Sequence, residues 1–169
     1  GFGFDMVFAV AVDSQNRLFA AGGTSAGGGG VFNFPRTDGQ QLNGNNDIFV
    51  SRISSDGKEL ERSVLFGGSE SEWAFAMALD SRGRIWLAGW TDSANGFPTN
   101  GALNGVSTYN GTRFGGKVDG YVMRLSQDLR VEFSSYVGGA DEDYATSLLL
   151  DRRGRIVVAG STRSANFPT

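Results

Sequence analysis

A repeated motif constrains this chain more than any other feature of its sequence. The stretch AMALDSRGRIWLAGWT at residues 76–91 recurs as AVAVDSQNRLFAAGGT at 9–24 and as SLLLDRRGRIVVAGST at 147–162. Within the three copies, Asp13, Asp80 and Asp151 lie 67 and 71 residues apart. Self-similarity at such a period is typical of solenoids, propellers and other repeat arrays. The residues that vary the period are therefore expected in loops.

Each copy of the motif predicts a β-hairpin. Apolar runs at residues 9–12, 76–79 and 148–150 precede a turn, and second apolar runs follow at 18–21, 85–88 and 156–159. The turn begins with Asp, whose side chain bonds the backbone, and ends with Asn16, Gly83 or Gly154, which tolerate a left-handed backbone. Both runs are nearly continuous, which predicts strands that are buried on both faces.

Two further strands complete each repeat. Residues 47–53 and 119–125 alternate apolar and polar side chains, as a strand with one wetter face does. After short turns, residues 60–66 and 130–137 lead into the glycine pairs Gly67-Gly68 and Gly138-Gly139. Four strands in meander order form one blade of a β-propeller. The sequence therefore predicts an all-β chain with two complete four-stranded blades, 1–67 and 68–138, and a two-stranded half blade at 139–169.

Two and a half blades leave two expectations open. Propellers close with about four or more blades, so the predicted architecture does not form a ring by itself. The expectation that we favour is a piece of a longer protein. The alternative is a unit whose open hairpin takes strands from a neighbouring molecule, because exposed sheet edges invite such pairing.

A longer string of motifs recurs with the hairpin. In the second repeat it consists of Gly67-Gly68, Glu72, Ala74, Asp80, Gly83, Ala88-Gly89-Trp90-Thr91, Phe97-Pro98-Thr99 and Asp119-Gly120-Tyr121. The third repeat keeps the string as far as Thr169, whereas the first is more divergent and has Asn16 in place of the turn glycine. This string resembles the bacterial SBBP-type β-propeller repeat family. The resemblance implies a propeller that is secreted or held at the cell surface, and it implies little about activity.

Composition removes several function classes. The net charge is −3 and the basic residues are scattered, which argues against nucleic-acid binding. No run approaches the roughly 18 apolar residues of a membrane helix, so we expect no membrane insertion. Histidine and cysteine are both absent. The chain therefore holds no Ser-His-Asp triad, no Cys-His pair and no His-ligated metal.

Acidic residues recur at fixed positions of the repeat. Asp5, Glu72 and Asp143 are equivalent and come just before the innermost strand of each blade, near one mouth of a propeller channel. One hypothesis is a cation or catalytic-acid cluster. The interpretation that we favour is structural, with side chains that bond backbone N–H groups and tie blade to blade, because a unique site would break the repeat. Asp47 and Asp119, which begin the third strands, are interpreted in the same way.

The candidate ligand-binding residues lie mainly in a long loop. Segments 25–46 and 92–118 join the second and third strands, and connections of this length are often functional. Aromatic, amide and cationic side chains together suit a sugar or a peptide, although a loop packed on itself is the alternative. Trp90, which replaces Gly23 and Ser161 of the other repeats, is added as a stacking platform. The predicted ligand-binding set is Trp90, Tyr109, Asn110, Arg113, Phe114 and Lys117.

The sequence favours a non-enzymatic, extracellular or cell-surface scaffold. It would bind a protein or a glycan, or assemble with other chains, through long loops and open strand edges. The alternatives are a structural subunit of an extracellular fibre or surface layer, and a fragment of a propeller glycoside hydrolase. No cofactor is predicted. Asp141-Glu142-Asp143 offers oxygens to calcium without EF-hand spacing, so calcium is only a weak alternative.

Overall fold

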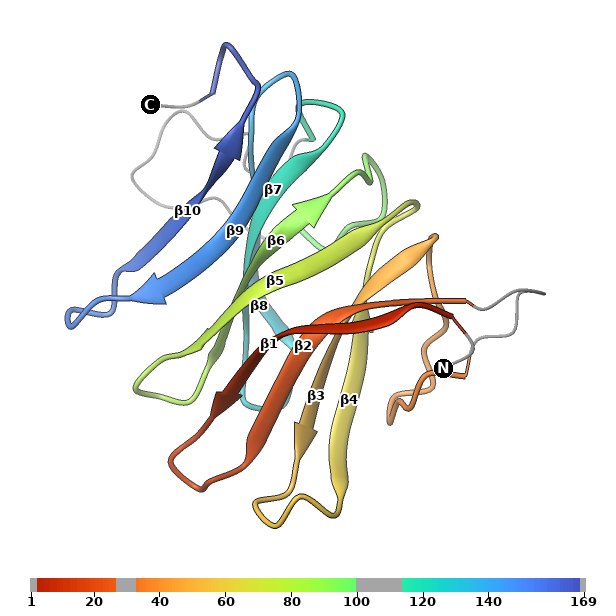
Figure 1. Cartoon of the computed structure of the whole chain (residues 1–169), viewed down its shortest axis with the longest axis vertical. Helices are drawn as coiled ribbons and strands as arrows, with labels where there is room; N and C mark the ends of the chain where they lie inside the picture. The colour runs from red at the N-terminus through yellow and green to blue at the C-terminus, as the bar shows by residue number, and fades with distance from the viewer. Residues whose placement is uncertain (1–2, 27–32, 100–113, 168–169) are drawn as a thin grey trace.

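The fold is all-β, as the repeat predicted. The structure is a computed structural model that describes residues 3–26, 33–99 and 114–167 of the chain. In these residues it has ten strands and no helix, and every neighbouring pair of strands is antiparallel. Figure 1 shows the strands gathered into three sheets that follow one another along the chain.

The strands pair in the predicted meander order. The first sheet has the order β1-β2-β3-β4, the second β5-β6-β7-β8, and the third is the two-stranded hairpin β9-β10. Their bounds are β1 Asp5–Val12, β2 Leu18–Ser25, β3 Asn46–Ile53, β4 Leu60–Phe66, β5 Glu72–Leu79, β6 Ile85–Thr91, β7 Asp119–Leu125, β8 Val131–Val137, β9 Asp143–Leu150 and β10 Ile156–Thr162. The innermost strands begin four or five residues before the apolar runs. Asp5, Glu72 and Asp143 are therefore the first residues of their strands and do not precede them, which corrects the sequence prediction.

A β-bulge explains why these strands are longer than their apolar runs. The register of each first hairpin shifts at Phe8, Phe75 or Thr146, which have no partner opposite them. A bulge inserts one extra residue and increases the local twist. On the far side of the bulge the pairing continues. It places each first acid opposite a threonine at or next to the end of the second strand, as in Glu72 opposite Thr91.

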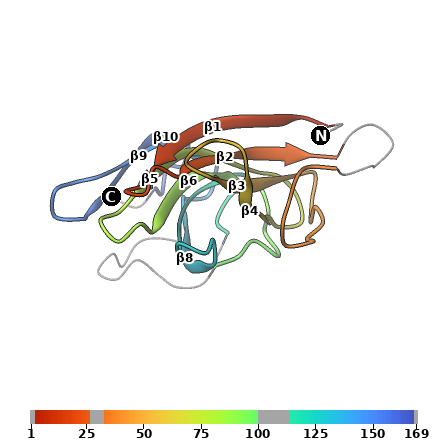
Figure 2. The ribbon, with the colours of Figure 1, turned by 90° about the horizontal axis from the view of Figure 1, so that it is seen from below.

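The three sheets stack face to face through apolar side chains. One cluster joins the first two sheets and includes Phe19 and Ile48 on one side and Ile85 and Leu87 on the other. A second cluster joins the second sheet to the hairpin, with Trp86 packed near Leu148. The innermost strands β1, β5 and β9 lie side by side and fan out in Figure 1, and Figure 2 shows the same stack from below.

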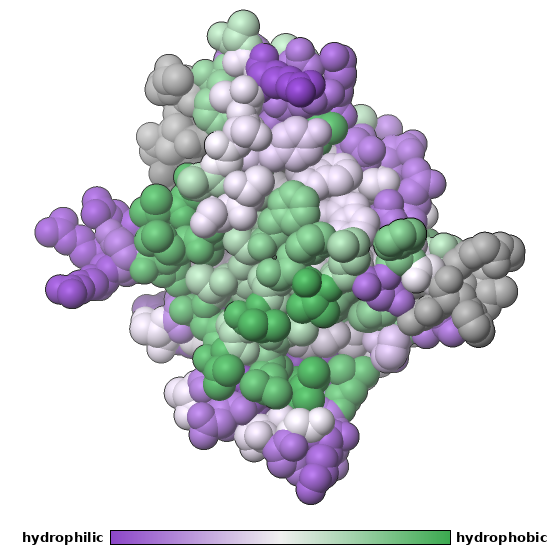
Figure 3. Space-filling model, in the orientation of Figure 1, coloured by the Kyte–Doolittle hydropathy of each residue, from purple (hydrophilic) through white to green (hydrophobic). Residues whose placement is uncertain are grey.

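The two ends of the stack are open. Val10 on β1 is 74% exposed, and Leu149 and Val157 of the hairpin are 54% and 50% exposed. The prediction of strands buried on both faces is correct for β6 and wrong for β1, β9 and β10, because no sheet among the described residues covers the outer face of these strands. A hydrophobic area overlies β1 in Figure 3. Within the described residues the three sheets do not close into a ring.

Candidate functional site

The repeated acids meet in pairs where one sheet follows another. Asp47, near the start of β3, and Glu72, the first residue of β5, both face Gly67, which lies between the two sheets in the chain. A Cβ atom at Gly67 would overlap Asp47 Oδ1 and come within 2.9 Å of Glu72 Oε2. The two carboxyl groups therefore lie on either side of a glycine that leaves no room for a side chain.

The same arrangement recurs at the next junction. Asp119 at the start of β7 and Asp143 at the start of β9 face Gly138, where a Cβ atom would come within 2.8 Å of Asp143 Oδ2. We call these two sets, Asp47–Gly67–Glu72 and Asp119–Gly138–Asp143, the acid junctions. Each takes one acid from the third strand of a sheet and one from the first strand of the next.

Hydrogen bonds hold the later acid of each junction. The Gly68 N–H donates to Glu72 Oε2 at 2.8 Å, and the Thr91 hydroxyl donates to Glu72 Oε1 at 2.6 Å. In the second junction the Gly139 N–H and the Ser164 hydroxyl donate to Asp143 Oδ2 at 2.6 and 2.7 Å. Bonds of this kind to backbone donors at a sheet connection are those expected of a structural role.

The earlier acid of each junction anchors the loop that leads into its strand. Asp47 Oδ2 accepts the Asn43 N–H at 3.0 Å, and Asp119 Oδ2 accepts the Gly115 N–H at 2.7 Å. Each bond spans four residues, so the carboxylate fixes the last turn of the long connection. Such contacts explain why an aspartate recurs at this position in both sheets.

The acids do not form a three-membered cluster. Asp5 accepts the Thr24 hydroxyl at 2.6 Å, but it is exposed at the open end of the stack. In the part of the chain that the structure describes, no three acidic side chains gather in a way that would hold a metal ion. The carboxylates of the Asp141-Glu142-Asp143 segment also have separate partners. Asp141 accepts a hydrogen bond from Lys117, and Glu142 accepts one from Arg163.

Burial sets the electrostatics of the first acid junction. Asp47 and Glu72 are 1% and 0% exposed. Burial raises the pKa of Asp47 from 3.8 to about 6. Burial also raises the pKa of Glu72, and the negative charge of Asp47 adds to that increase. Two neighbouring carboxyl groups without a cation favour a state that keeps one proton. Among the described residues, Asp47 Oδ1 is buried and has no hydrogen-bond partner.

Access to this pair from solvent is limited. A hollow of about 490 Å³ borders Asp47, and amide side chains from Gln40, Gln41 and Asn43 help to line it. The Asp47 side chain nevertheless exposes almost none of its surface. The low exposure of both carboxyl groups therefore favours a role in holding the sheets together.

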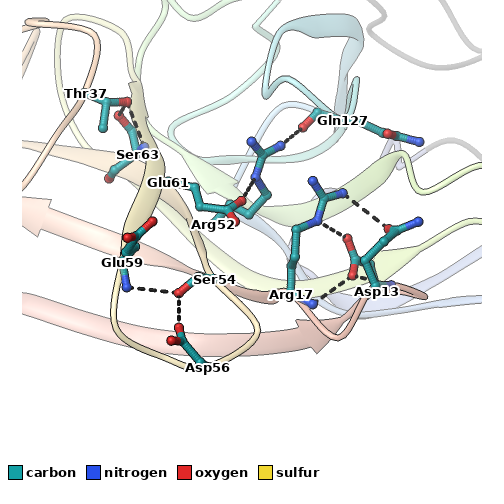
Figure 4. Close-up of polar contacts among 11 residues, drawn as sticks. Asp13, Arg17, Thr37, Arg52, Ser54, Asp56, Glu59, Glu61, Ser63 and Gln127 are labelled. Carbon is teal, nitrogen blue, oxygen red and sulfur yellow. Dashed lines mark hydrogen bonds and ion pairs between the residues drawn. The ribbon is translucent and has the colours of Figure 1, made fainter.

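Further polar contacts cross the first junction at its two ends. At one end the Asn45 N–H donates to the Glu70 carbonyl at 2.6 Å. At the other end Arg52 donates to the Gln127 carbonyl at 2.8 Å while its Nε bonds Glu61 at 2.8 Å (Figure 4). The acid junction therefore lies within a wider set of contacts that fix one sheet on the next.

Three of the predicted ligand-binding residues, Trp90, Phe114 and Lys117, lie within the part of the chain that the structure describes. Tyr109, Asn110 and Arg113 lie outside the described residues. Each of the other three has a different neighbour. Trp90 is half-buried with its ring edge-on to Tyr144 at 6.0 Å, Phe114 is edge-on to Tyr136 at 5.8 Å, and the exposed Lys117 pairs with Asp141 at 3.0 Å.

Sequence reasoning missed the pairing of the acids across the junctions. It grouped Asp5, Glu72 and Asp143 with one another because they are equivalent in the repeat. The signal for the true pairing was present, since Asp47 and Glu72 flank a glycine pair at nearly the same spacing as Asp119 and Asp143. The unpartnered Asp47 Oδ1 has no signal in the sequence.

These features define a class, an all-β repeat protein built from stacked antiparallel sheets that are joined by buried carboxyl pairs. No protein-family model matches the chain, and no curated protein matches it. Within the described residues there is also no helix of the length and hydrophobicity that crossing a membrane requires.

Proposed function

We propose that the chain is a non-enzymatic repeat scaffold of the β-propeller kind, with SBBP-type repeats. It works outside the cell or at its surface and binds a protein or a glycan. Four-stranded meanders that stack face to face, with their innermost strands side by side, are the packing that propeller blades use. The string of glycine, Asp-turn and Phe-Pro motifs supports the same assignment.

One observation carries the proposal. The carboxyl groups best suited to acid–base chemistry, Asp47 and Glu72, are buried between sheets and bonded to the backbone of their own connections. What the described residues present to solvent instead includes residues 36–45, which lead into β3, and the apolar ends of the stack. These surfaces suit recognition better than catalysis.

Assembly into a fibre or surface layer is the second candidate function. The open apolar faces of β1 and of the hairpin favour it, because contiguous exposed apolar surface marks interaction sites. The glycoside hydrolase alternative has no comparable support, since it requires two carboxyl groups that a sugar can reach.

Binding to a glycan array and to immobilised peptides tests the scaffold proposal. We expect Tyr109→Ala to weaken binding of the ligand that the array identifies by about tenfold or more, which is about 1.4 kcal/mol. Gln15→Ala, in an exposed turn, is the matched control and should bind normally. Trp90→Ala should mainly lower stability, because Trp90 packs on Tyr144.

A hydrolysis assay on the same glycans could contradict the scaffold proposal. Cleavage that disappears in Glu72→Gln, while circular dichroism shows an intact fold, would mean that the junction acids reach a substrate. The scaffold proposal would then be wrong. Absence of cleavage together with loss of binding in Tyr109→Ala would support it.

A further inference from the structure

The open face of the first sheet carries a set of apolar side chains. Val7, Val10, Val12 and Leu18 point away from the second sheet and are 38–74% exposed. We call this set the β1 face. A hollow of about 270 Å³ opens on the same side of the sheet, lined partly by Phe34 and Phe49. The area is visible over β1 in Figure 3.

The repeat shows what covers such a face. The equivalents of the β1 face in the second sheet are Ala74, Met77, Leu79 and Ile85. All four pack in the cluster that joins the first two sheets, and Ala74 and Ile85 are 0% exposed. The β1 face is therefore one half of an interface that the chain already uses.

The hairpin at the other end of the stack carries the other half. Leu149, Val157 and Ala159, here called the β10 face, are all exposed. Val157 is equivalent to Phe19 of the first sheet and Trp86 of the second, which are 2% and 8% exposed under the following sheet. The β1 face thus corresponds to the side of a sheet that packs on the preceding sheet, and the β10 face corresponds to the side that the following sheet covers.

A contact of inner-strand side chains fixes the register. The Trp73 ring lies so close to Gly23 that a Cβ atom there would come within 2.5 Å of it, and the equivalent Tyr144 lies against Trp90. The next pair in this series is Met6, which is 42% exposed, and Ser161, which is also exposed. A sheet that covered the β1 face in the same register would place its Ser161 equivalent under Met6.

We propose that the β1 face binds the β10 face of a second copy of this chain, with Met6 of one copy over Ser161 of the other. The inference rests on the scaffold function and names the chain itself as a partner. A second copy is the occupant because it carries the complementary side of the contact that already joins the sheets within one chain. Since the two faces differ, the contact is heterologous and extends into a ring or a filament.

Light scattering over a range of concentrations is the first test. The average mass should rise above the 18.0 kDa of one chain as concentration increases. Val10→Asp should keep the mass at 18.0 kDa, because it places a carboxylate in the centre of an apolar contact. Ser55→Asp adds the same charge at an exposed turn of the first sheet and should assemble like the parent chain.

Disulfide cross-linking tests the register without removing an apolar side chain. The chain has no cysteine, so two single-cysteine variants can be mixed without background. We expect a dimer from Met6→Cys mixed with Ser161→Cys, and none from Met6→Cys mixed with Arg153→Cys, which lies in the exposed turn of the same hairpin. Each variant alone should also give no dimer.

Two results would overturn the proposal. One is a folded monomer at every concentration with no cross-link between Met6→Cys and Ser161→Cys. The other is a Met6→Cys dimer formed by that variant alone, which would show a symmetric contact between two β1 faces. Either result leaves the scaffold function standing, because that function is tested separately, by binding to glycans and peptides and by the hydrolysis assay on Glu72→Gln.

Discussion

Single residues control how the sheets meet, and the Asp47–Glu72 pair makes this control depend on pH. The raised pKa of Asp47, about 6 against its usual 3.8, means that the folded chain holds a proton that the unfolded chain has lost. The free energy of unfolding therefore falls as pH rises from about 4 to 6, and it levels off above that range. Glu72, whose pKa is also raised by burial, contributes with the same sign.

Asp47→Asn should remove the part of this pH dependence that comes from Asp47 and leave the part that comes from the burial of Glu72. Asparagine is neutral at every pH and can still accept the Asn43 N–H, so the variant keeps the loop contact without burying a charge. We expect the free energy of unfolding at pH 7.5 to increase by about 1–3 kcal/mol, given about 1.4 kcal/mol for each unit of pKa shift. Urea unfolding at pH 5 and pH 7.5 measures the difference between the parent chain and the variant.

An exposed aspartate gives the control for this prediction. The Ser54 hydroxyl and the Lys58 N–H lower the pKa of Asp56, so its charged form is the stabilised one. Asp56→Asn should leave the fall in stability between pH 4 and 6 in place. A parent chain whose stability does not change between pH 5 and 7.5 would contradict a proton held at the junction.

At the scale of elements, the Asp turn closes the first hairpin of every sheet by the same bonds. In the second sheet Asp80 Oδ1 accepts the N–H groups of Arg82 and Arg84, and Asp80 Oδ2 accepts the Arg84 Nε at 2.6 Å. The equivalent aspartate and arginine pair in the first hairpin is drawn in Figure 4. The last turn residue has a left-handed backbone, with φ of 59° at Asn16 and 72° at Gly83.

Gly83→Ala should destabilise the second sheet. Alanine resists a left-handed backbone by about 1 kcal/mol or more, and its Cβ would also lie 3.0 Å from the Gln127 amide. Asn16→Gly removes a side chain at the equivalent turn and should change stability by only a few tenths of a kcal/mol. Thermal unfolding of both variants measures the contrast, and an equal effect of the two would contradict the argument from backbone conformation.

The elements were predictable because local chemistry fixes them. Alternating or continuous apolar runs between Asp turns identified every strand, and the bounds of β4 and β7 agree with the prediction. The starts of β1, β5 and β9 were not predicted, because the bulge that extends them has no sequence signature of its own. The pairing of Asp47 with Glu72 depends on how one sheet lies on the next, which the repeat pattern does not state.

At the scale of the whole molecule, the stack makes stability unequal along the chain. Among the described strands, the main contacts of each sheet are with its neighbours, as in other repeat proteins, so the second sheet is held from both sides and the end sheets from one. Leu87, in the middle, is 0% exposed, whereas Val157 on the hairpin is 50% exposed. Exchange of backbone amide hydrogens should therefore be slowest in β6 and β7 and fastest in β10.

Leu87→Ala and Val157→Ala should separate the centre of the stack from its end. At low protein concentration, Leu87→Ala should lower the free energy of unfolding by about 2–4 kcal/mol through the cavity it leaves, and Val157→Ala by about 0.5 kcal/mol or less. Urea unfolding gives both values. Equal costs would contradict the nearest-neighbour stack. If a second copy covers the β10 face, the cost of Val157→Ala should grow with protein concentration while that of Leu87→Ala does not, because only Val157 gains a partner from assembly.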